Sequence, residues 1–254
     1  MKIRGIAAYS YWLALFFLTL PFFSFAVRRD FLNPDNLNLP SIWQSLQVSL
    51  VSSAVASLIV LVIGIPAAYY VAKARFKFKR FFDALLNLPQ VLPPAVIGIL
   101  LLFAYGNQGF FGRYLNRIGI RTSFSPLAVI LTFLFVSLPI FINGCALAFA
   151  KIDPELEQTA ALLGDSSGKV FFRITLPLAK KGMFTAFLMS WSRGIAEFGA
   201  TMMFAGNLPG VTQTLPLAIF SALETNFYDA LMLAFIMFIL AAVVLIGIYL
   251  LSKE

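Results

Sequence analysis

Long apolar runs, separated by short charged or proline-rich segments, dominate the pattern of hydrophobic and polar positions along the chain. Most of them reach about 20 residues, the length that an α-helix needs to cross the roughly 30 Å hydrocarbon core of a bilayer. No repeated segments of alternating polarity, which would indicate a membrane β-barrel, compete with them. The pattern predicts an all-α, polytopic membrane protein with about six transmembrane helices, at residues 8–27, 46–72, 84–105, 126–150, 183–205 and 228–251.

Composition supports this class and excludes others. The 254 residues are 60% hydrophobic and 12% charged, whereas a soluble domain is about a quarter charged. We therefore expect one transmembrane domain over residues 1–254. The net charge is +8, and the basic residues lie mostly between the apolar runs. Such a distribution sets the orientation of a protein in the membrane and does not indicate a nucleic-acid partner. The chain has no histidine, and its one cysteine, Cys145, excludes an internal disulfide, so no metal site is expected.

The distribution of Lys and Arg predicts the orientation. If the N-terminus lies inside, thirteen basic residues face the cytoplasm and five face outward, as the positive-inside rule requires. Both termini are then expected in the cytoplasm, and the protein in the plasma (inner) membrane as a multi-pass protein. The inner set is Lys2, Arg4, Lys73, Arg75, Lys77, Lys79, Arg80, Lys151, Lys169, Arg173, Lys180, Lys181 and Lys253; the outer set is Arg28, Arg29, Arg113, Arg117 and Arg121.

The first apolar run has a second interpretation. It follows the basic start Lys2-Ile3-Arg4, and Ser24-x-Ala26 resembles a signal-peptide cleavage site. The apolar part is long for a signal peptide, so we favour an uncleaved helix.

Two later spans carry marks of helix packing or of a break. Ser49, Ser53 and Ser57 recur every four residues, which places small side chains on one stripe where another helix can approach closely. The third span begins with a segment containing three prolines, Pro89, Pro93 and Pro94. They interrupt backbone hydrogen bonding and predict either a kink or a broken helix that lines a pathway.

A charged island, residues 153–177, separates the fourth and fifth spans. Asp153-Pro154-Glu155 is a strong helix start, because aspartate caps free amides and proline fits the first helical position. Leu156, Ala160 and Leu163 form one apolar face, and Gly164 suits the end of this helix, over about 154–163. A second short helix should then include residues 169–173 and end before Pro177.

The sequence GDSSGKV inside the island is not a phosphate-binding loop. Such a loop needs four residues between its glycines, and a hydroxyl side chain after the lysine that binds magnesium. Here Gly164 and Gly168 are one residue too close, and Val170 replaces the hydroxyl. The chain itself is therefore expected to bind no ATP.

Val170, Phe171 and Phe172 lie among charged residues in the island. Apolar residues rimmed by polar ones usually mark a surface for a partner protein, so we expect these three to be exposed for docking. The alternative is a solvated loop that only connects two spans.

The spacing of Gly164, nine residues and Ile174-Thr175-Leu176-Pro177 resembles the EAA loop of ABC importer permeases. That family has Glu-Ala-Ala where this chain has Gln158-Thr159-Ala160, with Glu157 one residue earlier. The resemblance implies a cytoplasmic loop over 152–181 whose coupling helix, about 163–173, docks on a separate ATPase. The implied coupling residues are Glu157, Ala160, Gly164, Val170, Phe171, Phe172, Arg173 and Pro177.

The segment 193–217 is similar to the corresponding part of molybdate and tungstate permeases, with sulfate permeases close behind. Together with the loop, this resemblance covers a permease core of about 46–251. It implies a homodimer with the pathway at its interface, ATP and Mg on partner ATPase subunits, and delivery by an extracytoplasmic oxyanion-binding protein. A sulfate or thiosulfate permease is the alternative cargo class.

Arg193 and Glu197 lie within the predicted fifth span, four residues apart on one helical face. Lone charges in a membrane cost several kcal/mol, so the two should neutralise each other or a neighbour. Either structural pairing or a role beside the translocation path fits this position. With Pro93 and Pro94 they make up the candidate intramembrane site.

Two rival classes remain at this stage. An intramembrane enzyme would need a histidine pair, facing aspartates or a serine nucleophile in a strained turn, and none is visible, so we expect a transport subunit and no enzyme. A secondary transporter or channel fits the hydropathy, but it predicts inverted repeats, which the two halves of the chain do not show.

Overall fold

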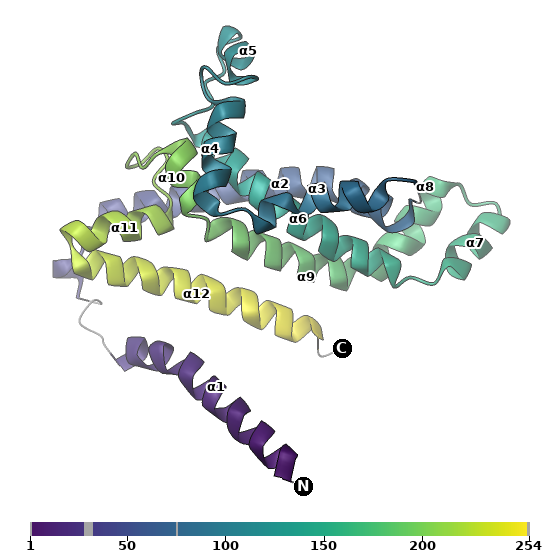
Figure 1. Cartoon of the computed structure of the whole chain (residues 1–254), viewed down its shortest axis with the longest axis horizontal. Helices are drawn as coiled ribbons and strands as arrows, with labels where there is room; N and C mark the ends of the chain where they lie inside the picture. The colour runs from purple at the N-terminus through teal and green to yellow at the C-terminus, as the bar shows by residue number, and fades with distance from the viewer. Residues whose placement is uncertain (1, 28–32, 75, 253–254) are drawn as a thin grey trace.

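The computed structural model describes residues 2–27, 33–74 and 76–252, and every regular element within these ranges is helical. The centre is a bundle of α2 (Leu39–Lys73), α6 (Pro126–Ala150) and α9 (Leu176–Ile195), which lie side by side (Figure 1). Val60, Phe141 and Phe149 are buried where these helices meet. The all-α prediction is confirmed for the described part of the chain.

Three predicted spans are single apolar helices long enough to cross a bilayer. They are α2, α6 and α12 (Phe227–Ser252), which correspond to the predicted spans 46–72, 126–150 and 228–251. The first predicted span lies in α1 (Lys2–Val27), whose described apolar stretch, Ala8–Phe23, is shorter than a full span. The other two predicted spans are interrupted.

The third predicted span, 84–105, is two helices. α3 (Lys79–Val91) and α4 (Pro94–Tyr105) meet at an angle of 112°. Leu92 and Pro93 have extended backbones between them, because a residue that precedes proline is disfavoured in the helical region. The proline cluster therefore produces a broken helix, while its place beside a pathway stays a prediction.

The fifth predicted span, 183–205, is also wrong as one helix. α9 begins earlier, at Leu176, and ends at Ile195; α10 (Gly199–Ala205) follows after a break. The break is held by contact with the third span, since a Cβ atom on Gly199 would lie 2.9 Å from Cβ of Pro94. A further helix, α11 (Leu215–Thr225), precedes α12 and was not among the predicted elements.

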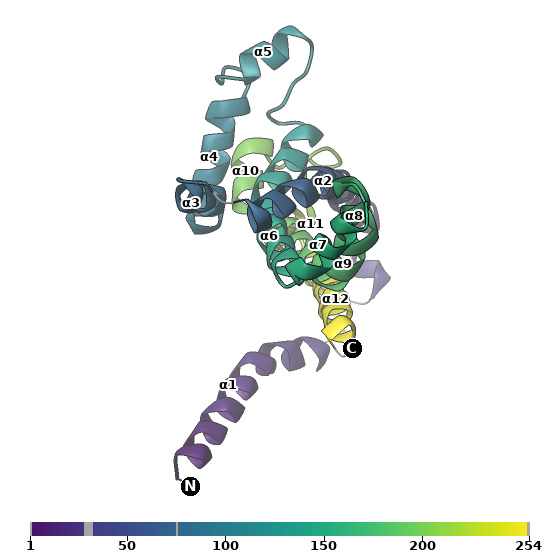
Figure 2. The same cartoon turned by 90° about the vertical axis from the view of Figure 1, so that its right-hand side faces the viewer.

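The remaining helices lie around the bundle. α5 (Gly112–Arg117) extends beyond α4, while α1 diverges from the other helices and contacts α12 through the rings of Phe22 and Phe238, 5.5 Å apart (Figure 2). The predicted serine stripe of α2 is buried in packing, as expected: Ser49, Ser53 and Ser57 are almost fully covered. Ser49 also accepts a 2.7 Å hydrogen bond from the Leu215 backbone N–H, which fixes the start of α11.

Candidate functional site

The first helix of the island is α7 (Pro154–Leu162), one residue shorter than predicted. Asp153 caps it, because Oδ1 of its carboxylate accepts a 3.0 Å hydrogen bond from the Glu155 backbone N–H. Gly164 ends the turn with φ of +96°, a conformation that glycine adopts without strain. The predicted start and stop of this helix are both confirmed.

The second part of the island differs from the prediction. α8 (Ser167–Val170) continues through a π-helix, η3 (Phe171–Thr175), directly into α9, and the backbone stays helical throughout. Pro177 therefore does not end the island. Its ring removes one i−4 hydrogen bond, and the wider π-turn just before it accommodates this loss. The helix that contains most of the predicted coupling segment begins at Ser167, four residues later than 163.

The expectation of an exposed apolar surface is wrong for Val170 and Phe171. Val170 is buried, and the ring of Phe171 packs 5.0 Å from that of Tyr69 on α2. Phe172 is 68% exposed. Adjacent residues on a helix point about 100° apart, so the paired phenylalanines face opposite environments. Arg173 is exposed beside Phe172.

Two leucines at the end of α7 are exposed on the surface, which the sequence analysis did not predict. Leu162 and Leu163 are 88% and 84% exposed, although the sequence pattern assigned Leu163 to an inward apolar face. Of that predicted face, only Ala160 is buried. Leu163 follows the last helical residue of α7 and does not continue its stripe, and Leu156 within the helix is also exposed, by 49%. The sequence feature that could have indicated their exposure is the position of both leucines directly before Gly164, where the helix ends.

Glu157 points inward and joins three elements. Its Oε2 lies 2.7 Å from Nζ of Lys73 at the end of α2, and its Oε1 accepts a 2.8 Å hydrogen bond from the Thr175 hydroxyl in η3. Thr175 is fully buried, and the Glu157 side chain is 16% exposed. We call Lys73, Glu157 and Thr175 the Glu157 clamp. It ties α7 to the end of α2 and to η3, which continues into α9.

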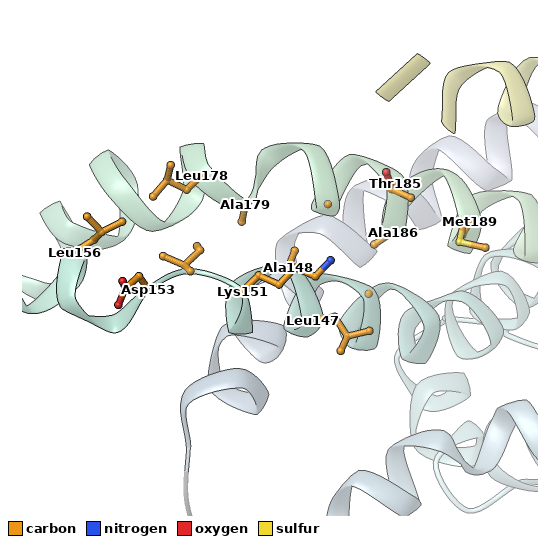
Figure 3. Close-up of a pocket in the computed structure, with 13 residues that line it drawn as sticks. Leu147, Ala148, Lys151, Asp153, Leu156, Leu178, Ala179, Thr185, Ala186 and Met189 are labelled. Atoms are coloured by element: carbon orange, nitrogen blue, oxygen red, sulfur yellow. The ribbon is translucent and has the colours of Figure 1, made fainter. Parts of the chain in front are cut away.

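An open groove of about 730 Å³ runs between α6 and α9 beside α7. In Figure 3, Leu178, Ala179 and Ala186 of α9 lie across from Leu147 and Ala148 of α6. The two helices approach closely because small residues meet at their contact: a Cβ on Gly144 would lie 2.5 Å from Cβ of Ala186, so no larger residue fits there without a shift.

The predicted ion pair is formed in the break between α9 and α10. Nη1 of Arg193 lies 2.6 Å from Oε2 of Glu197, and the two side chains are 41% and 2% exposed. Oε1 of Glu197 also accepts a 3.0 Å hydrogen bond from the Ala200 backbone N–H, which caps the first turn of α10. The sequence prediction of pairing is confirmed, and the capping role was missed.

The intramembrane candidates come together at this place. Pro94, at the start of α4, contacts Gly199, two residues after Glu197. Polar side chains from α2, α10 and the segment before α11 line the same internal space as Glu197: Ser49, Ser52, Ser53, Thr201 and Thr214. The hydroxyl of Thr214 is buried and has no hydrogen-bond partner among the residues that the structure describes. The buried Glu197 carboxylate thus faces a small space lined by these hydroxyls together with Val129 and Phe133 of α6.

The helical membrane bundle agrees with what the comparisons with known proteins show: the chain is the permease subunit of an ABC importer, a transport component and not an enzyme. It belongs to the family of binding-protein-dependent transport system inner membrane components, whose model matches residues 60–253.

Similar proteins include three transport permeases. The molybdenum transport system permease protein ModB of Mycobacterium bovis is 37% identical, covering 91% of this chain and 88% of that protein. ModB of Escherichia coli K12 is 39% identical, covering 72% and 80%. The molybdate/tungstate transport system permease protein WtpB of Methanocaldococcus jannaschii is 33% identical, covering 78% of each chain.

Among solved structures, a chain of a bacterial alginate ABC transporter in complex with its periplasmic protein superposes with a TM-score of 0.73, covering 96% of this chain and 93% of that one. At 15% sequence identity this likeness concerns the fold alone.

Proposed function

We propose that two copies of this chain form the translocation pathway of an ATP-driven importer for an oxyanion, with molybdate or tungstate as its cargo. The observation that carries the proposal is the 33–39% identity to permeases named for molybdenum or for molybdate and tungstate transport. Sulfate or thiosulfate is the second candidate cargo, favoured by the resemblance of residues 193–217 to sulfate permeases.

Physical chemistry explains why such a cargo needs this machinery. A doubly charged oxyanion cannot cross hydrocarbon unaided, because its desolvation costs tens of kcal/mol. A water-filled path between two copies avoids that cost. Separate ATPase subunits would bind ATP and Mg, dock on the island and open the path outward to an extracytoplasmic oxyanion-binding protein. Hydrolysis would then return it inward.

The placement of charges supports an orientation with the island and both termini in the cytoplasm. The island protrudes at the end of the bundle where α2 and α6 finish (Figure 1), and this end carries Lys73, Lys151 and Lys169. Arg113 and Arg117 lie away from this end, on α5, which stands off the bundle beyond α4 (Figure 1). More basic residues at the island end agree with the positive-inside rule.

Reconstitution tests the function directly. The chain, its co-purifying ATPase and the extracytoplasmic binding protein are placed in liposomes, and ATP hydrolysis is measured with molybdate, tungstate or sulfate. We expect molybdate or tungstate to stimulate hydrolysis and to accumulate inside. Stimulation by sulfate alone would make sulfate the cargo in place of molybdate or tungstate. Uphill transport by the chain without an ATPase would contradict the proposal.

Phe172→Glu is expected to weaken ATPase docking by about tenfold or more, because a charge replaces an exposed aromatic anchor of the kind that dominates interface energies. Recovery of the ATPase with the tagged chain measures the effect. Tyr114→Glu is the matched control, since Tyr114 is an exposed aromatic on α5, away from the island (Figure 1). Equal recovery with both variants would remove Phe172 from the docking surface.

A further inference from the structure

The connection between α2 and α3 combines exposed aromatic rings with exposed cations. Residues 76–82 read Phe-Lys-Phe-Lys-Arg-Phe-Phe and follow a stretch, 39–72, that contains no charge. Its four phenylalanines are all exposed, Phe78 by 62%. We call residues 76–82 the aromatic-basic segment. It follows the C-terminal end of the apolar helix α2, the position at which interfacial aromatic and basic residues are expected.

The cations of this segment have different tasks. Lys79 is partly buried, and its Nζ donates a hydrogen bond to the Val71 carbonyl, which closes the turn between the helices. Lys77 and Arg80 are exposed. Nζ of Lys77 lies 5.8 Å from the centre of the Phe78 ring. Two cations therefore remain for a ligand outside the chain, beside rings that water solvates poorly.

The shape of the region suits a ligand with a charged head and an apolar body. Residues 76–81 enclose an open cavity of about 600 Å³. The helix that follows, α3, has no buried residue, and it stands to one side of the bundle (Figure 2). Its exposed Phe82 and Leu85 continue the apolar surface beyond the cavity. The one acidic residue between 73 and 91 is Asp83, so the local charge is strongly positive.

We propose that the aromatic-basic segment binds an anionic phospholipid of the membrane leaflet at the island end. Lys77 and Arg80 hold the headgroup phosphate, and the phenylalanine rings lie against the glycerol and the upper acyl chains. Basic residues beside an anionic leaflet attract its lipids, while interfacial aromatic rings prefer this depth. An acidic protein partner that contacted only the basic residues would leave the apolar residues of α3 in water, whereas a lipid covers both. The site depends on membrane embedding and not on the transported cargo.

Native mass spectrometry of the full chain with its co-purified partners tests the proposal, as phosphatidylglycerol is titrated into detergent. The double variant Lys77→Gln/Arg80→Gln is expected to raise the apparent Kd roughly tenfold, because each basic residue contributes to attraction by an anionic headgroup. Arg113→Gln/Arg117→Gln is the matched control, with two cations beside the Tyr114 ring on α5, away from the aromatic-basic segment (Figure 1). It should leave the Kd unchanged.

Several outcomes would overturn the proposal. An equal loss of phosphatidylglycerol affinity in the two double variants would indicate unspecific electrostatic attraction. Equally tight binding of neutral phosphatidylcholine would show that charge plays no part in binding. Unchanged lipid binding together with lower recovery of a partner chain or of the second copy would make the segment a protein contact. If the double variant does not fold, titration of the unmodified chain at rising ionic strength still decides, since a Kd that does not weaken contradicts a charge-based site.

Discussion

Replacing Glu197 with alanine is expected to lower the free energy of unfolding by about 3 kcal/mol, because the change removes a buried ion-pair partner and a helix cap together. Glu197 is almost fully buried, and its two oxygens serve Arg193 and the Ala200 N–H. Without it, Arg193 retains a charge beside the break with no counter-charge. The unfolding midpoint of the purified chain in detergent measures the loss.

Glu224→Ala is the matched control, since Glu224 is exposed near the end of α11. Exposed substitutions of this kind usually change stability by no more than about 0.5 kcal/mol. Glu197→Gln should recover part of the loss, because its amide oxygen can still accept the Ala200 N–H. A Glu197→Ala chain as stable as the control would show that the pair contributes nothing.

The geometry also refines what a charge swap can restore. A chain with Arg193→Glu and Glu197→Arg would recover the ion pair, but an arginine at 197 has no acceptor for the Ala200 N–H. We therefore expect partial recovery, less than a symmetrical pair would give. The asymmetry arises because Glu197 is 2% exposed and Arg193 is 41% exposed.

The predicted spans succeed where membrane thickness alone decides and fail where tertiary contacts decide. α2, α6 and α12 follow from the length of uncharged sequence, because hydrocarbon requires an unbroken helix of that length. The break between α9 and α10 depends on contact between Gly199 and Pro94, which lie 105 positions apart in the sequence. A pattern confined to one segment cannot contain that information.

The island shows the same division at the level of single residues. Its caps at Asp153 and Gly164 are local, so the sequence predicts them correctly. The burial of Phe171 results from contact with Tyr69 on a distant helix, and the sequence does not distinguish this ring from that of Phe172. The Glu157 clamp likewise joins residues 84 positions apart. Its inward direction favours an internal support over the predicted contact with the ATPase, which stays a prediction.

Glu157→Ala is accordingly expected to uncouple ATP hydrolysis from transport while the ATPase still docks. The clamp holds α7 against α2 and η3, so force applied to the island reaches both long helices. Without it the island would move independently of the bundle, and uptake per ATP should fall about tenfold, within the usual range of coupling free energies. The measurement is the ratio of anion transported to ATP hydrolysed in the reconstituted importer. This prediction rests on the proposed function.

Glu155→Ala provides the matched control, because Glu155 lies two residues earlier on α7 and is exposed. A double-mutant cycle of Glu157→Ala with Lys73→Met separates the clamp from a direct contact with the ATPase. If Glu157 acts through Lys73, the second substitution adds little to the first, since the interaction is already lost. Fully additive losses, or reduced ATPase recovery with Glu157→Ala alone, would instead assign Glu157 to the docking surface.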